Sequence, residues 1–538
     1  MFTRKTILRA AGASLAAILS LAAQPLRAQG SDAERLQKLE QAINQLQKRN
    51  AELEQEVSGL KKRTSWEPVV AGEGKGKTEV TSDGKTFVEK FVPDLKGGEK
   101  WKLAPWITEL ELFGDLRLRY EYRGGRLPSD HNDNPNDWYE RERERYRLRV
   151  GLRGTVLDDW FFGLRLETSN SSRSTNVTFG GESSGGPFAK GDDGLFVGQA
   201  YFGYKGFPDF TLTGGRMPQP LIVTSMLWDD DINPEGVAQQ WKHTFVFGGG
   251  PPPPASYSKD GKAVAPGKPP EPFLKLDLFV NTAQFVYDDE NPENPIGPDP
   301  TTDANTPGSP QKIPIHDAFM LAWQTGAKLT FPQFHSFYIQ VAPTLYNYTG
   351  NGDTFNVHYV GGNPALSNGD SLATNQTGIN SLLVFDVPAE IGWKAWGLPM
   401  RIFGEFADNI EGHDRAHAAA ELGGFEAHTG QHYAWEIGGA VGQLKKKGDW
   451  ELRAWYQHAE QYALDPNLVD SDIFDSRLNE KGVAVKGGYM LADAISLNLT
   501  WAYSWRINGR LGTGGLGDIQ VNPLDQYQLF QADMSVKF

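Results

Sequence analysis

The sequence predicts an all-β protein, a transmembrane antiparallel β-barrel of about sixteen strands preceded by an α-helical coiled coil. Three observations support this fold class. Segments of about ten residues alternate apolar and charged side chains from Leu112 onward, long polar loops alternate with short turns, and no apolar run reaches the roughly 18 residues of a membrane helix. A barrel between lipid and water needs this alternation, because successive side chains of a strand point to opposite faces.

The clearest strand is ERERERYRLRVGLRG at positions 140–154. Its arginines recur at intervals of two, which places them on one face, whereas Tyr146, Leu148, Val150 and Leu152 occupy the other. A soluble β-sandwich would leave an inward arginine row unpaired in its core. We therefore expect the apolar face to meet lipid and the arginines to line a water-filled pore. With FGDLRLRYEY at 113–122, the predicted pore-lining cations are Arg117, Arg119, Arg145, Arg147, Arg149 and Arg153.

Short connections such as 157–159, 206–209 and 445–448 alternate with long ones rich in Gly, Asp, Asn and Pro. The strands between the long loops number about sixteen, with both chain ends on the short-turn side, as in outer-membrane barrels. The proline-rich stretch 248–272 falls where a short turn is expected. The strand count around 237–287 therefore stays open.

Residues 1–28 are predicted to be a signal peptide, because a basic start precedes the apolar run Ala10–Ala23 and a small residue, Ala28. The alternative is a buried N-terminal helix. Loss of the leader's four basic residues takes the net charge from −14 to −18. Such an acidic balance argues against a nucleic-acid partner. The absence of cysteine excludes disulfides and a lipidated N-terminal cysteine.

Residues 31–63 are predicted to form a coiled-coil oligomerisation stalk in the periplasm. Positions spaced alternately by three and four form its seam: Leu36, Leu39, Ile43, Leu46, Asn50, Leu53, Val57 and Leu60. A homotrimer is expected, although branched residues and a buried Asn at a positions favour two strands, so that a dimer stays open. A lone amphipathic helix is the alternative. Residues 64–109 are predicted to be a periplasmic linker or small hairpin turning at Asp83-Gly84, and whether residues 66–106 plug the pore stays open. Residues 110–538 are predicted to form the barrel.

The segment GGRMPQPLIVTSMLWDDDINPEGVA places four carboxylates behind an apolar stretch: Asp229, Asp230, Asp231 and Glu235. The apolar stretch indicates a packed loop. The spacing of Asp229, Asp231, Asn233 and Glu235 is also that of calcium-loop ligands, but the turn glycine is missing and Pro234 intrudes, so no metal site is predicted.

The leader followed by a coiled coil, the GDLRLRYEYR and RERYRLRVGLRG strands and this loop segment resemble the putative porin family of Gram-negative outer membranes, over most of residues 110–538. The layout is more distantly similar to the phosphate-selective porins, although these loops are acidic and carry no dense lysine cluster. The resemblance implies that the loop after the fifth strand folds into the lumen. It also implies that the last strand, ending at Phe538, is recognised by the barrel-assembly machinery.

An inward loop would set its carboxylates against the arginine row and create a transverse field. We therefore expect an outer-membrane porin that passes small hydrophilic solutes and ions, embedded in outer-membrane lipid, with no enzymatic activity and no cofactor. The alternatives are a structural anchor whose coiled coil reaches peptidoglycan, and a substrate-specific channel with Tyr201, Phe279 and Trp455 facing inward. The transported solute and the sign of ion selectivity are not predicted.

Overall fold

The computed structural model describes residues 76–82, 87–93, 104–127, 138–171, 173–180, 194–250, 256–257, 263–264, 270–288, 318–349, 381–423, 426–513, 519 and 524–538. The chain divides into two units, Met1–Lys102 and Leu103–Phe538. In the first unit β1 (Gly76–Ser82) and β2 (Phe87–Pro93) pair antiparallel around residues 83–86. The predicted signal peptide and coiled coil lie outside the described residues.

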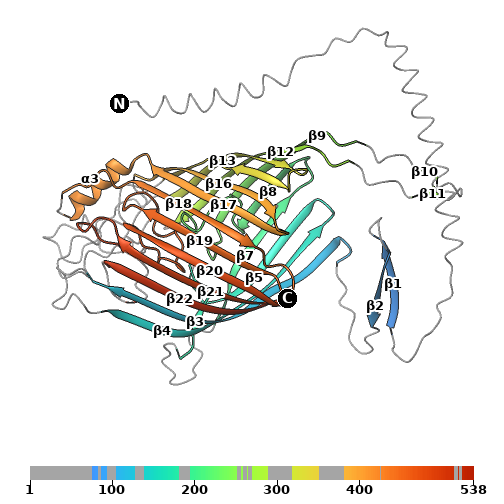
Figure 1. Cartoon of the computed structure of the whole chain (residues 1–538), viewed down its shortest axis with the longest axis horizontal. Helices are drawn as coiled ribbons and strands as arrows, with labels where there is room; N and C mark the ends of the chain where they lie inside the picture. Colours follow the sequence, from blue (N-terminus) through green and yellow to red (C-terminus); the bar gives the residue numbers. More distant parts are fainter. Residues whose placement is uncertain are drawn as a thin grey trace, which may run out of the picture. The chain divides into compact units, whose positions relative to one another are not determined.

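The second unit is a closed antiparallel barrel (Figure 1). Its segments are β3 (Ile107–Arg126), β4 (Tyr139–Val156), β5 (Trp160–Thr168), β6 (Val177–Thr178), β7 (Leu195–Tyr204), β8 (Phe210–Arg216), β9 (Glu235–Phe247), β12 (Leu274–Asp288), β13 (Ala318–Phe331), β14 (Phe337–Val341), β15 (Thr344–Thr349), β16 (Leu383–Ala395), β17 (Leu398–Asn409), β18 (Tyr433–Gly442), β19 (Trp450–Ala459), β20 (Glu480–Ala492), β21 (Ile495–Arg506) and β22 (Gln526–Lys537).

Within the described ranges these segments make sixteen strands, which confirms the predicted antiparallel barrel of about sixteen strands. The segments β14 and β15 both lie between β13 and β16 and together form one strand. The break between them contains Pro343, which has no N–H for a ladder hydrogen bond. The two-residue β6 pairs only with β4, beyond the end of β5.

The proline-rich insertion does not disturb the strand order. Strand β9 pairs directly with β12, from Phe247 opposite Leu274 to Gly236 opposite Phe285. The insertion between them carries a separate pair of two-residue strands, β10 (Ser256–Tyr257) and β11 (Ala263–Val264). The strand assignment around 237–287 is therefore settled, with one long connection on the short-turn side.

The last strand closes the barrel on the first. Strand β22 pairs with β3, and the backbone groups of Phe538 and Gly114 exchange hydrogen bonds of 2.8 and 3.1 Å. A Cβ at Gly114 would lie 2.4 Å from the backbone carbonyl oxygen of Arg149, so this close approach requires glycine. The helix α3 (Gly412–Gly423) lies between β17 and β18, at the end of the barrel away from the C-terminus (Figure 1). Among the described residues, no helix is long and apolar enough to cross a membrane.

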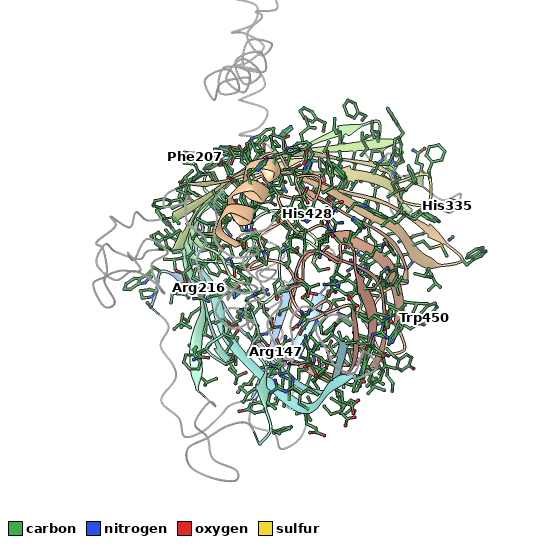
Figure 2. The ribbon with its side chains drawn as sticks, turned by 90° about the vertical axis from the view of Figure 1, so that its left-hand side faces the viewer. Arg147, Phe207, Arg216, His335, His428 and Trp450 are labelled. Carbon is green, nitrogen blue, oxygen red and sulfur yellow. The ribbon has the colours of Figure 1, made fainter. Side chains whose placement is uncertain are left out.

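The outer face of the strands is apolar, as their two-residue alternation predicts. Exposed side chains on it include Leu116, Leu118, Leu152, Leu164, Phe202, Val237, Trp323, Ile402, Ile437, Leu452, Leu497 and Leu499. Exposed aromatic residues flank the short turns: Trp160, Phe207, Phe334, Trp396 and Trp450. Trp450 projects outward from the ring of strands, whereas Arg147 lies inside it (Figure 2). The barrel thus separates an apolar exterior from a charged interior.

Candidate pore constriction

Residues 217–234, which we call the inner loop, connect β8 to β9 and fold into the lumen. The side chains of Met226 and Trp228 are 0% and 3% exposed and pack on wall residues such as Phe285. Burial of an apolar side chain of this size contributes about 1.5–3 kcal/mol. Small residues on the facing strands leave space for the loop: Ala238, Ala283, Ala318, Ala322, Ala407, Ala434 and Ala459. The apolar stretch of the loop segment is therefore its contact with the wall.

Polar contacts show how far the inner loop reaches across the lumen. The Ile222 backbone donates to Oε1 of Gln324 on β13 at 3.0 Å, and its carbonyl accepts Nε2 of the same side chain at 2.8 Å. The Thr224 hydroxyl donates to the Glu405 carboxylate on β17. The loop therefore runs from β8 to strands across the barrel.

Residues 460–479, which we call the second loop, join the inner loop inside the lumen. The Asp229 N–H donates to the Leu468 carbonyl at 2.6 Å, and the Ser471 N–H donates to Asp229 Oδ2 at 2.9 Å. The guanidinium of Arg173, from the connection after β5, donates to the carbonyls of Pro466 and Val469 at 2.7 and 3.2 Å. This contact cannot be predicted from the sequence, because the backbone groups that take part in it carry no residue-specific signal.

The arginine row faces inward, as its period predicts, but most of it is buried. Exposure is 9% for Arg117, 5% for Arg119, 7% for Arg145 and 8% for Arg147. Carboxylates of neighbouring strands and of the second loop cover these side chains. Arg119 lies 2.7 Å from Asp533 and 2.8 Å from Asp472. The structure therefore differs from the expectation that these four arginines line open water.

Two further arginines of the row, Arg149 and Arg153, are more accessible. Arg147 and Arg149 both pair with Asp115, at 2.8 and 2.7 Å, and the Arg149 side chain keeps 20% exposure. Arg153 is 55% exposed and pairs with Glu111 at 2.7 Å. We call Arg117, Arg119, Arg145, Arg147 and Arg149, with their carboxylate partners, the arginine wall.

The predicted acidic residues separate into different environments. Asp231 faces the arginine wall, 3.7 Å from Arg147 and 3.5 Å from Arg149. Asp229 is bound between the two loops, where burial, followed by the charge of Asp231, raises its pKa to about 7. Glu235 lies apart, 55% exposed and 2.8 Å from Arg216. The structure thus brings only Asp231 to the arginines that were expected to oppose it.

Asp230 is the exposed carboxylate of the three consecutive aspartates. The charges that act on it include those of Lys486 on β20 and Arg453 on β19. Asp230 and Arg453 line one cavity of about 230 Å³ between the inner loop and β16, β17 and β19. An exposed negative charge on the inner loop therefore lies near an exposed lysine and a half-buried arginine of the strands, away from the arginine wall.

Arg453 is held by aromatic rings. Its guanidinium carbon lies 4.2 Å from the ring centroid of Phe403 and 4.8 Å from that of Trp455. Trp455 was predicted to face inward, whereas Arg453 was not among the predicted site residues. The segment WELRAWYQH has the same two-residue period and could have revealed it, since Glu451, Arg453 and Trp455 share a face.

The model of the putative porin family matches residues 88–357 and 383–538 of the sequence. No curated protein matches the chain. Among solved structures, Pseudomonas putida OprB shares 12% identity over 80% of this chain and 94% of its own, with a TM-score of 0.39. A triple mutant of Rhodopseudomonas blastica porin shares 12% identity over 80% and 100%, with a TM-score of 0.34. The outer membrane channel DcaP of Acinetobacter baumannii shares 12% identity over 80% and 97%, with a TM-score of 0.34.

Proposed function

Because the chain belongs to the putative porin family, we propose that it is an outer-membrane porin for passive diffusion of small hydrophilic solutes and ions, with its constriction beside the inner loop. The family and the closed barrel identify an outer-membrane channel. The finer assignment depends on one observation. Asp230 on the inner loop is exposed and faces the cations Arg453 and Lys486.

A constriction with opposite charges on its two sides orders water and favours polar solutes over apolar ones. The cavity walls add further charges, since Glu390 and Arg401 line it as well. The transverse field then lies between Asp230 and the cations of β19 and β20, and not at the arginine wall. The arginine wall then serves mainly to hold the second loop in place.

A substrate-specific channel is the second candidate. The observation that favours it is the interlocking of the inner loop with the second loop through the Asp229, Leu468 and Ser471 contacts. Two joined loops leave less of the lumen open than one loop would. Such a channel would discriminate solutes by size and charge pattern.

The stalk and partner assignments remain predictions. They comprise a homotrimer formed through the coiled coil at 31–63, contact of that stalk with peptidoglycan, and recognition of the Phe538 strand by the barrel-assembly machinery. The structural-anchor alternative depends on the same stalk, which lies outside the described residues.

Planar-bilayer recording tests the proposed porin directly. The mature chain is expected to give discrete conductance steps, and a tenfold KCl gradient gives a reversal potential that reports ion selectivity. Asp230→Asn should shift that potential toward anion preference and Arg453→Gln toward cation preference, because local charge at a constriction outweighs distant charge that salt screens within about 8 Å. The exposed Arg510→Gln provides a matched control. A membrane that stays silent at high protein load would overturn the porin assignment.

A further inference from the structure

The cavity beneath the inner loop contains four charged residues: Asp230, Glu390, Arg401 and Arg453. Its volume of about 230 Å³ suits a small solute more than a drug-sized ligand. Backbone and side chains of the inner loop close one side, from Ile222 to Ser225, and Pro388 and Phe403 on the strands close the other. The cavity is therefore a half-open recess beside the proposed constriction, lined by both charged and apolar side chains.

Two of these four charges are already neutralised inside the protein. Arg401 lies 3.6 Å from Glu390 and 3.3 Å from Glu451. Glu390 also accepts the hydroxyl of Tyr338. These groups form a self-contained network, so an incoming charged group would have to compete with existing partners.

The other two charges have no such partners. Among the described residues, neither the Arg453 guanidinium nor the Asp230 carboxylate makes a salt bridge or a hydrogen bond, and Arg453 Nε is buried without a partner. Every arginine of the arginine wall, in contrast, pairs with a carboxylate within 4.0 Å. Arg401 and Glu390 are engaged in salt bridges, so the cavity presents one cation, Arg453, and one anion, Asp230, that no salt bridge engages.

The position of Arg453 is fixed without a salt bridge, although the charges of Glu436 and Glu451 also act on its guanidinium. The rings of Phe403 and Trp455 hold its guanidinium by cation–π contact. A guanidinium fixed in this way keeps its planar donor edge available and loses little further freedom when it binds a carboxylate. An arginine that is held by aromatic rings and not by salt bridges keeps its charge available to a bound carboxylate.

We propose that this cavity binds a small zwitterionic solute of the α-amino acid class, with its carboxylate on Arg453 and its ammonium group on Asp230. The inference deepens the proposed function by naming a solute class for the same pore, although binding itself does not depend on conduction. An anion or a cation of the same size would satisfy only one of the two unpaired groups and leave the other without a partner. The zwitterion satisfies both.

Three matched solutes test the proposal: alanine, propionate, which lacks the ammonium group, and ethylamine, which lacks the carboxylate. Saturation-transfer difference NMR on the full chain in detergent measures the binding of each. We expect alanine to bind about tenfold more tightly than either analogue, the effect of one charge-assisted hydrogen bond. Arg453→Gln should weaken alanine and propionate by a similar factor and leave ethylamine unchanged, while Asp230→Asn should weaken alanine and ethylamine only.

Arg510→Gln, an exposed arginine outside the cavity, should change none of the three affinities. Equal binding of the three solutes, or variants that alter all three equally, would overturn the proposal. Bilayer recording of the same preparations separates this result from the proposed function. Conductance without preferential binding of alanine would contradict the proposed binding site and leave the porin assignment intact. Preferential binding of alanine without conductance would support the binding site and contradict the porin assignment.

Discussion

The arginine wall and Arg453 place the same residue type on inward-facing strand positions, with opposite outcomes. Arg119 is 5% exposed and lies within 2.8 Å of two carboxylates, Asp533 and Asp472. Arg453 lines a cavity and rests on two aromatic rings. An inward arginine of this barrel can therefore be held by salt bridges, as Arg119 is, or by aromatic rings, as Arg453 is.

The comparison also separates two uses of charge inside a barrel. A buried ion pair gains little net stability, because desolvation offsets the attraction, yet removal of one partner leaves a costly buried charge. The pairs of the arginine wall consequently fix the position of the second loop. Arg453 instead lies against the rings of Phe403 and Trp455 and lines a cavity.

The largest expected effect is that of Arg119→Ala, which leaves Asp533 and Asp472 without their shared cation. Loss of one partner of a buried pair typically costs about 3–5 kcal/mol of unfolding free energy. Thermal unfolding in detergent, followed by the heat-dependent electrophoretic mobility of the barrel, measures this loss. Arg453→Ala in parallel should cost less, since Glu436 and Glu451 interact with its charge without forming a salt bridge. Equal destabilisation by the two variants would contradict the distinction between the two regions.

A second prediction concerns pH. Burial and then the charge of Asp231 raise the pKa of Asp229 to about 7. Just below that pH, Asp229 therefore holds a proton while the two loops are interlocked and releases it when they separate. Burial and the charge of Asp229 also raise the pKa of Asp470. Asp472 stays ionised across this range, because nearby arginines, Arg119 foremost, outweigh its burial and lower its pKa.

The sign follows from proton linkage. The interlocked state gains stability as pH falls below about 7, and this gain is lost as pH rises through that value. Single channels should spend more time in a low-conductance state at pH 5 than at pH 8, with the equilibrium changing by at most about tenfold per pH unit for one proton. Asp229→Asn should remove most of this dependence. A wild-type channel insensitive to pH over this interval would contradict the prediction.

Much of the fold could be predicted from the sequence because lipid imposes a strict alternation on every strand. The period of two puts the arginines of β3 and β4 on one face of each strand, and Arg117, Arg119, Arg145 and Arg147 are buried there. Their burial could not be predicted, since Asp472 lies 353 residues from Arg119 and reaches it only through the fold of the second loop. The insertion at 248–272 was ambiguous because its proline-rich composition is typical of a long outer loop.

The candidate site was predictable in part. The apolar stretch of the inner loop correctly indicated packing, and Trp455 was identified as inward-facing. Which of the three aspartates stays exposed could not be read from three consecutive identical residues. Arg453 is the one arginine of β19, so its strand lacks the repeated arginines that make β4 conspicuous. Its aromatic neighbours, which distinguish it in the structure, do not form a sequence motif.

The smallest expected effect is that of Arg153→Ala. Arg153 belongs to the same row but is 55% exposed, and its partner Glu111 is 50% exposed. Surface pairs of this kind contribute little to stability, because water and salt screen them. Thermal unfolding should be unchanged within error, in contrast to Arg119→Ala. A large loss of stability would show that the arginine wall extends further toward the short-turn end than burial indicates.

Cysteine accessibility tests most directly where the pore runs, because the chain has no native cysteine. Lys486→Cys places a thiol on the exposed side of the proposed constriction, and Ser535→Cys places one beside Arg117, where exposure is 8%. A charged, water-soluble methanethiosulfonate reagent should modify the thiol at 486 rapidly and reduce the current through single channels, while the thiol at 535 should stay unmodified. Rapid modification at 535 with loss of current, and none at 486, would contradict this and place the path along the arginine wall.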